Sequence, residues 1–84
     1  MPKIEIYTTP YCPYCVRAKQ LLDQKAVTYL EIDVSNDPER KAEMIQRAQR
    51  HTVPQIFIDE KPYGGCDDLF ELNHAGKLDK LLSD

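Results

Sequence analysis

Long apolar runs are missing from this sequence of 84 residues, and none approaches the roughly 20 residues needed to span a bilayer. Among the first seven residues, the charged residues Lys3 and Glu5 also interrupt the apolar ones. We therefore expect neither a signal peptide nor a membrane anchor, and no membrane among the partners. A chain without a secretion signal is expected in the cytoplasm.

Excess positive charge is missing as well. The formal net charge is -3 and the sequence pI is about 5.3. No basic stripe is interleaved with aromatic residues, so the chain has no cationic field to attract phosphates. Nucleic acid is therefore not an expected partner.

Cysteine is scarce, with three in the chain. An odd number leaves one thiol unpaired, and the reducing cytosol dissolves most structural disulfides. A scaffold held by disulfides is therefore not indicated, which leaves metal binding or redox chemistry for these residues.

The length and composition set the size of the core. With 84 residues, 42% of them hydrophobic and 30% charged, the chain has room for one compact domain with one modest core. We predict a single domain over residues 1–84.

The first half of the chain predicts two strands around a helix. Lys3–Thr8 alternates apolar and polar residues, as a half-buried strand does. Pro13 to about Lys25 predicts a helix, with the proline in the first turn and Cys12 at the N-terminus. The residues expected on or beside its buried face are Cys15, Ala18, Leu21 and Leu22. Val27–Val34 is nearly continuously apolar and predicts a strand covered on both faces.

A second helix is predicted to begin at Asp37-Pro38, where the acidic side chain caps the helix and the proline occupies its first turn. The residues expected on its buried side are Ala42, Met44, Ile45 and Ala48. Pro54–Ile58 predicts a third strand, Asp59–Pro62 a turn, and Tyr63–Gly64 a short fourth strand.

The last part of the chain predicts a third helix over Cys66–Ala75, which Gly76 can end in a left-handed conformation. A short amphipathic turn follows, with its apolar side formed by Leu78, Leu81 and Leu82. The order βαβαββα predicts an α/β domain with a four-stranded mixed sheet flanked by helices. Strands joined through a helix tend to be parallel, whereas a short turn makes the last pair antiparallel.

The most specific motif is Cys12-Pro13-Tyr14-Cys15, two cysteines separated by two residues between a strand and a helix. At a helix N-terminus several backbone amides lack partners and the helix dipole is positive, which favours a thiolate at Cys12. The thiolate is the attacking form of cysteine. Cys15, almost one turn later, faces the core. We therefore predict that Cys12 attacks and that Cys15 resolves the mixed disulfide.

A zinc site is the alternative. A closed structural zinc site needs four ligands, usually in two close pairs. The other candidate ligands are Cys66, His51 and His74, and none of them is paired at such a spacing. We therefore favour redox chemistry and expect no metal, with both histidines as solvated surface residues and Cys66 as a small buried thiol.

With this motif in place, the chain resembles the glutaredoxins, most of all the bacterial glutaredoxin 3 type. The similar segments cover nearly the whole length and are Glu5–Thr8, Cys12–Cys15, Thr52–Ile58 and Gly64–Leu69. The resemblance implies the thioredoxin fold and an enzyme that uses glutathione as co-substrate, with no tightly bound cofactor. It would reduce disulfide-containing proteins and remove glutathione from glutathionylated ones, and it is expected to be a monomer.

The resemblance also implies a glutathione site. The Val53-Pro54 peptide bond would be cis, and the backbone of Val53 would pair with glutathione like an added strand. From the residues alone, a proline that merely begins a strand is the favoured interpretation. The residues that the resemblance places around glutathione are Tyr14, Thr52, Val53, Pro54, Gly65, Cys66 and Asp67.

Within this site, the backbone amides of Cys66 and Asp67 would receive the γ-glutamyl carboxylate, because the N-terminus of a helix binds anions. The Asp67 side chain would receive the ammonium. A turn with an ordinary acidic helix cap is the alternative.

One position departs from the family. Many glutaredoxins carry a lysine three residues before the first cysteine, and this chain has Thr9 there. Lys41 or Arg17 could replace that lysine in holding the glycine carboxylate.

Two other functions remain open. Some glutaredoxins hold an iron–sulfur cluster between two chains, although Pro13-Tyr14 is bulkier than the residues common in those members. A thioredoxin-like enzyme reduced by a flavoenzyme is the other.

Overall fold

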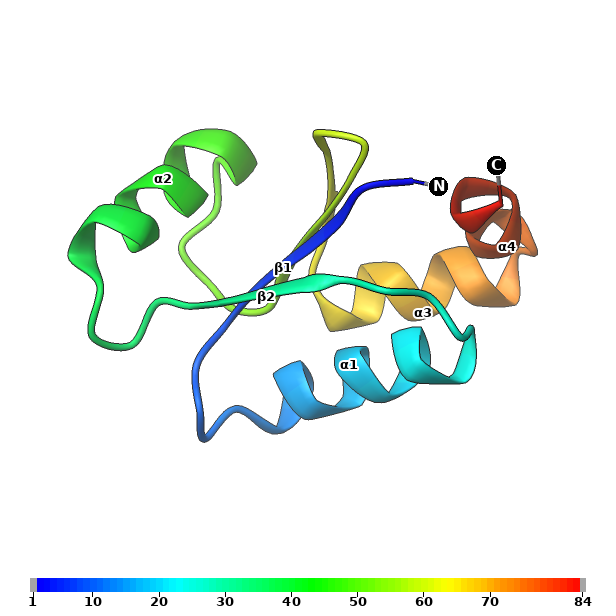
Figure 1. The fold of residues 1–84 in the computed structure, drawn as a ribbon, viewed down its shortest axis with the longest axis horizontal. Helices are drawn as coiled ribbons and strands as arrows, with labels where there is room; N and C mark the ends of the chain where they lie inside the picture. The colour runs from blue at the N-terminus through cyan, green and yellow to red at the C-terminus, as the bar shows by residue number, and fades with distance from the viewer. Residues whose placement is uncertain (1, 84) are drawn as a thin grey trace.

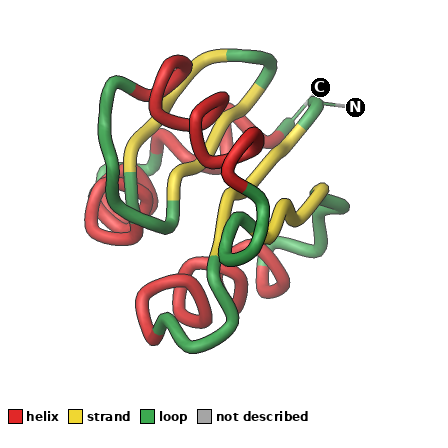
Figure 2. Tube along the Cα trace, turned by 90° about the vertical axis from the view of Figure 1, so that its left-hand side faces the viewer, coloured by secondary structure: helices red, strands yellow, loops and turns green. Residues whose placement is uncertain are grey.

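The computed structural model describes residues 2–83, and in them helices lie on both sides of a mixed β-sheet (Figures 1 and 2). The elements are β1 (Ile4–Thr8), α1 (Pro13–Gln24), β2 (Leu30–Asp33), α2 (Pro38–Ala48), β3 (Gln55–Ile58), β4 (Lys61–Gly64), α3 (Cys66–His74) and α4 (Lys77–Leu82). The predicted fold class and the order of the first seven elements are confirmed. The turn predicted around Leu78 is a separate helix, α4, which begins after Gly76 in a left-handed conformation (φ 73°).

The sheet has the strand order β2-β1-β3-β4. β1 pairs with β2 in parallel and with β3 in antiparallel orientation, and β3 pairs with β4 in antiparallel orientation. The parallel pair is the one joined through a helix, as expected. Because β1 and β3 are antiparallel neighbours, the loop after β1, which leads to Cys12, lies beside the loop before β3, which ends at Pro54.

Side chains alternate between the two faces of β1, and each face has its own core. Ile4 and Ile6 face α1, α3 and α4; in Figure 1, α1 and α3 lie below the strands and α4 lies to their right. Tyr7 faces α2, above the strands, and packs there with Phe57 at a ring-centroid distance of 5.5 Å. Among residues 2–83, no helix is long and apolar enough to cross a membrane.

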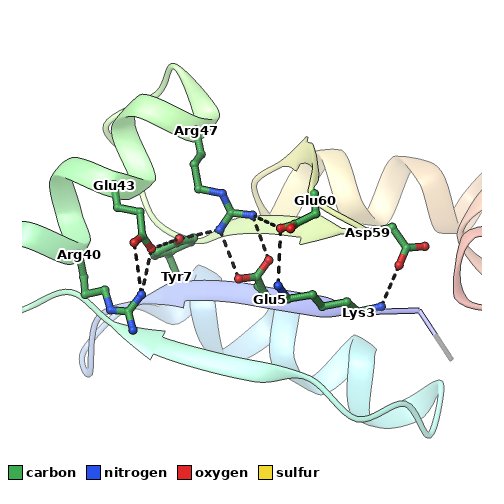
Figure 3. Close-up of polar contacts among 8 residues, drawn as sticks. All are labelled: Lys3, Glu5, Tyr7, Arg40, Glu43, Arg47, Asp59 and Glu60. Carbon is green, nitrogen blue, oxygen red and sulfur yellow. Dashed lines mark hydrogen bonds and ion pairs between the residues drawn. The ribbon is translucent and has the colours of Figure 1, made fainter.

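Arg47 of helix α2 binds several groups on the neighbouring face of the sheet (Figure 3). The Arg47 guanidinium donates to the Glu5 carboxylate at 2.9 Å and to the Tyr7 hydroxyl at 2.7 Å. It also lies 4.0 Å from the centroid of the Phe57 ring. Glu60, from the turn before β4, accepts a further hydrogen bond from it.

Three predictions about these elements were wrong. β2 is shorter than Val27–Val34 and is not covered on both faces: it lies at the edge of the sheet, and its one buried residue, Ile32, packs with Met44 of α2. Ala42 is exposed, and Met44 is the fully buried residue of α2. The turn before β4 comprises only Asp59 and Glu60, both at positive φ, so β4 begins at Lys61.

Candidate active site

The two cysteines of the motif lie at the start of α1 in different environments. Cys12 is the N-cap residue with extended backbone, and Pro13 occupies the first turn. The backbone N–H of Cys15 donates to the Cys12 Sγ at 3.1 Å. Cys12 is partly exposed, whereas Cys15 is only 1% exposed. A sulfur that accepts a backbone hydrogen bond and reaches solvent is placed to attack, and the second sulfur is placed behind it.

Burial has a chemical consequence for the other two thiols. Loss of solvation, together with a hydrogen bond to Cys12, raises the pKa of Cys15 to about 12. Loss of solvation also raises the pKa of Cys66, which is 4% exposed. At neutral pH both residues are therefore thiols rather than thiolates.

The loop before β3 forms the wall opposite Cys12. The Val53–Pro54 peptide bond is cis, which confirms that expectation. The Val53 carbonyl oxygen lies 3.8 Å from the Cys12 Sγ. The Pro54 carbonyl on the same loop closely approaches the start of α3, because a Cβ atom on Gly65 would lie 3.2 Å from it.

Next to Cys12, a groove of about 300 Å³ runs between this loop and the N-terminus of α3. All seven residues that the sequence analysis associated with glutathione line it: Tyr14, Thr52, Val53, Pro54, Gly65, Cys66 and Asp67. Three separate segments of the chain thus meet at one groove. The structure places these residues together, and their roles remain predictions.

Arg50 and Asp68 also line the groove, and sequence reasoning missed both. The Arg50 guanidinium donates to the Asp68 carboxylate at 2.8 Å, which joins the loop before β3 to α3. The same carboxylate accepts the backbone N–H of Gly65 at 2.9 Å, and this hydrogen bond and Arg50 lower the pKa of Asp68. An acidic residue in the first turn of a helix was a signal for Asp68, whereas nothing in the sequence pointed to Arg50.

Gly64 makes the approach of Asp68 possible. Its φ is +88°, which disfavours any residue with a side chain, and a Cβ atom there would lie 2.3 Å from the Asp68 Oδ2. The glycine before α3 therefore leaves space for the carboxylate that fixes the Gly65 amide.

A second cavity, of about 670 Å³, lies on the other side of Val53. It is lined in part by Thr9, Lys41 and His51. Arg17, the other candidate to replace the family lysine, lies 5.8 Å from the centroid of the Phe70 ring on α3 instead. Of the two cations, only Lys41 lines this cavity.

Potential metal ligands are not gathered in the part of the chain that the structure describes. Among residues 2–83, no group of three or more His, Cys, Asp or Glu side chains is placed to hold a metal ion. His51 and His74 are both exposed, as expected.

Comparison with known proteins identifies the family. The sequence model of the glutaredoxin family, described as "Glutaredoxin", matches residues 4–62. This chain belongs to the glutaredoxin family. It is 57% identical over 83 residues to a glutaredoxin of Pseudomonas aeruginosa, with 99% of both chains covered. It is 51% identical over 82 residues to glutaredoxin 3 of Escherichia coli K12, with 98% of this chain and 99% of that relative covered.

Solved glutaredoxins share the fold. The crystal structure of a buckwheat glutaredoxin–glutathione complex superposes with a TM-score of 0.88 at 33% identity, covering 96% of this chain and 76% of that one. The predicted resemblance and the thioredoxin fold are thereby confirmed. This glutaredoxin is a thiol–disulfide oxidoreductase.

Proposed function

We propose that this glutaredoxin uses glutathione as its reductant, with Cys12 as the nucleophile and Cys15 as the resolving thiol. We further propose that its substrates are glutathionylated proteins and protein disulfides. The observation that carries the proposal is the position of the Cys12 Sγ, partly exposed and 3.8 Å from the Val53 carbonyl at the groove. A disulfide held along that groove would present its sulfur to Cys12.

The groove suits the zwitterionic γ-glutamyl end of glutathione. The free amides at the N-terminus of α3 favour a carboxylate. Asp68 is already bound by Arg50 and Gly65, whereas Asp67 is exposed and has no ion-pair partner among residues 2–83. Asp67 is therefore available to receive the ammonium group, as predicted.

The opposite end of glutathione carries the glycine carboxylate. We propose Lys41 as its partner, since Lys41 lines the cavity beside Val53 and Arg17 lies beside Phe70. A cation at Lys41 would replace the lysine that many relatives have at the position of Thr9.

For a glutathionylated protein, the reaction needs one cysteine of the enzyme. The Cys12 thiolate attacks the glutathione sulfur, the protein thiolate leaves and takes up a proton, and Cys12 is joined to glutathione. The thiolate of a second glutathione then attacks the glutathione sulfur, which forms glutathione disulfide and releases the Cys12 thiolate. The second glutathione supplies the reducing equivalents, because its sulfur passes from thiol to disulfide while the protein sulfur passes from disulfide to thiol.

For a protein disulfide, both cysteines take part. Cys12 attacks one sulfur and forms a mixed disulfide, and Cys15 then loses its proton and attacks the Cys12 sulfur. The reduced protein leaves with two thiols, and two glutathione molecules reduce the Cys12–Cys15 disulfide. Burial keeps Cys15 protonated until that step, because its pKa is raised to about 12.

The test is a glutathione-coupled assay on a small glutathione mixed disulfide and on a protein disulfide. Cys12→Ser should lose essentially all turnover of both substrates, because it removes the nucleophile. Cys15→Ser should keep turnover of the mixed disulfide and lose most reduction of the protein disulfide. Ala42→Ser, at an exposed position of α2 that lines neither the groove nor the cavity beside Val53, is the control and should keep both activities.

The reverse pattern for Cys12 and Cys15 would overturn the assignment of their roles. Wild-type enzyme that is reduced by a flavoenzyme but not by glutathione would overturn the choice of reductant.

A further inference from the structure

Gln55 is a buried polar residue that the mechanism above does not use. It begins β3 directly after Pro54 and is only 1% exposed. Phe57, two residues later on the strand, belongs to the core under α2, so Gln55 lies on that same face of the sheet. A buried amide is unfavourable unless its polar atoms are hydrogen-bonded.

One end of the Gln55 amide is bonded to the loop. Its Nε2 donates to the Thr52 carbonyl oxygen at 3.0 Å and to the Thr52 Oγ1 at 3.3 Å. Because a carbonyl oxygen can only accept, the nitrogen and not the oxygen of the amide must face Thr52. The buried amide thus ties an exposed loop residue to the start of β3.

The other end of the amide has no partner. Among the described residues, the Gln55 Oε1 is a buried side-chain oxygen without a hydrogen bond. An apolar side chain of similar volume would avoid this unpaired acceptor. Gln55 therefore does not optimise the stability of the core. Its role lies instead in the hydrogen bonds that its Nε2 makes to Thr52.

Thr52 connects Gln55 to the reacting sulfur. It lines the groove and directly precedes Val53, whose carbonyl lies 3.8 Å from the Cys12 Sγ. We infer that Gln55 is a positioning residue, which fixes the Thr52–Val53 backbone along which the glutathione part of the substrate binds. This inference rests on the proposed function.

The experiment compares Gln55→Met with wild type in the turnover of a small glutathione mixed disulfide. Methionine has a similar volume but cannot donate to Thr52. Because disorder in the loop weakens binding without touching Cys12, KM should rise about 5-fold or more while kcat stays within about 2-fold. The Tm should remain within about 4 °C of wild type or rise, since the unpaired oxygen is also removed.

Gln20→Met, at an exposed position of α1, is the matched control and should leave KM unchanged. Gln55→Leu is the second variant, since an aliphatic side chain cannot donate to the Thr52 carbonyl and should raise KM in the same way. A KM within 2-fold of wild type in a folded Gln55 variant would overturn the inference, and so would loss of folding in both variants. An inactive wild type would instead contradict the proposed function.

Discussion

Two sulfurs that are only three residues apart differ mainly in their contact with water. The Cys12 Sγ is partly exposed and accepts the backbone N–H of Cys15, while Cys15 is buried against the sheet. Helical geometry produces this difference. Cys12, the N-cap residue, lies at the end of the helix, whereas Cys15, the third residue of the helix, lies on the side that faces the core. The same turn of helix therefore supplies an attacking sulfur and a protected one.

This difference predicts selective alkylation. At pH 7, iodoacetamide should modify Cys12 in the reduced protein and leave Cys15 and Cys66 unmodified, because burial raises the pKa of both thiols and the thiolate is the reactive form. Labelling of Cys15 should increase only as the pH rises above about 9 toward 12, or when the protein unfolds. Mass spectrometry of the digested protein measures the modification at each site.

Denatured protein is the control, and all three cysteines should react in it. Modification of Cys15 as fast as Cys12 at pH 7 in the folded protein would contradict the assigned environments.

Helix α2 depends on polar contacts as much as on apolar packing. Met44 is its fully buried side chain, and Arg47 reaches across to Glu5 on β1 and Glu60 before β4 (Figure 3). Arg47 is 24% exposed and Glu5 is 9% exposed, so this pair is much better shielded from water than a surface pair. The helix forms one wall of the cavity beside Val53, so the same contacts hold Lys41 in place.

We predict that Arg47→Ala lowers the free energy of unfolding by about 1–2 kcal/mol, because it leaves the Glu5 carboxylate shielded without its partner. Arg47→Lys should recover less than half of this loss, since lysine lacks the planar fork that binds Glu5 and Tyr7 together. Urea denaturation measures both effects.

Arg40→Ala is the matched control on the same helix. The Arg40–Glu43 pair is solvent-exposed, and its loss should cost about 0.5 kcal/mol or less. Equal losses of unfolding free energy in Arg47→Ala and Arg40→Ala would contradict the prediction, because the shielded pair would then be worth no more than the exposed one.

The molecule as a whole is stabilised by two cores on opposite faces of one sheet, and the groove depends on both. The loop before β3, whose Val53 packs on the core under α2, forms one wall, and the start of α3, which belongs to the other core, forms the other. The short helix α4 closes the core below the sheet with the buried Leu78 and Leu82, and Lys25 at the end of α1 pairs with Asp79 at 2.8 Å. α4 contributes no residue to the groove beside Cys12.

Stability and activity should therefore separate at α4. Leu78→Ala should lower the free energy of unfolding by about 2–4 kcal/mol, as expected for a large-to-small change at a fully buried position. At temperatures where the variant is folded, its KM and kcat should stay within about 2-fold of wild type. Denaturation and the glutathione-coupled assay measure the two properties.

Leu81→Ala, at a half-buried position of the same helix, should cost less than half as much stability. A KM for Leu78→Ala that rises with the loss of stability would mean that α4 supports the groove after all.

The features that depend on a few neighbouring residues could be predicted from the sequence. Pro13 and Pro38 begin helices, and Gly76 separates two of them, because each acts through its own backbone within one turn. Local patterns were not enough to predict the cis bond before Pro54 or the residues around the groove. Those predictions came from the resemblance of four segments to the glutaredoxins.

The features that depend on residues far apart in the sequence could not be predicted in the same way. An apolar run such as Val27–Val34 looks the same in a central and in an edge strand, and the strand order placed β2 at the edge. Arg50 and Asp68 are 18 residues apart, and no local pattern indicates that they meet. The reason is physical: a turn or a cap is decided by local backbone geometry, whereas exposure and long-range pairing follow from how the helices pack on the sheet.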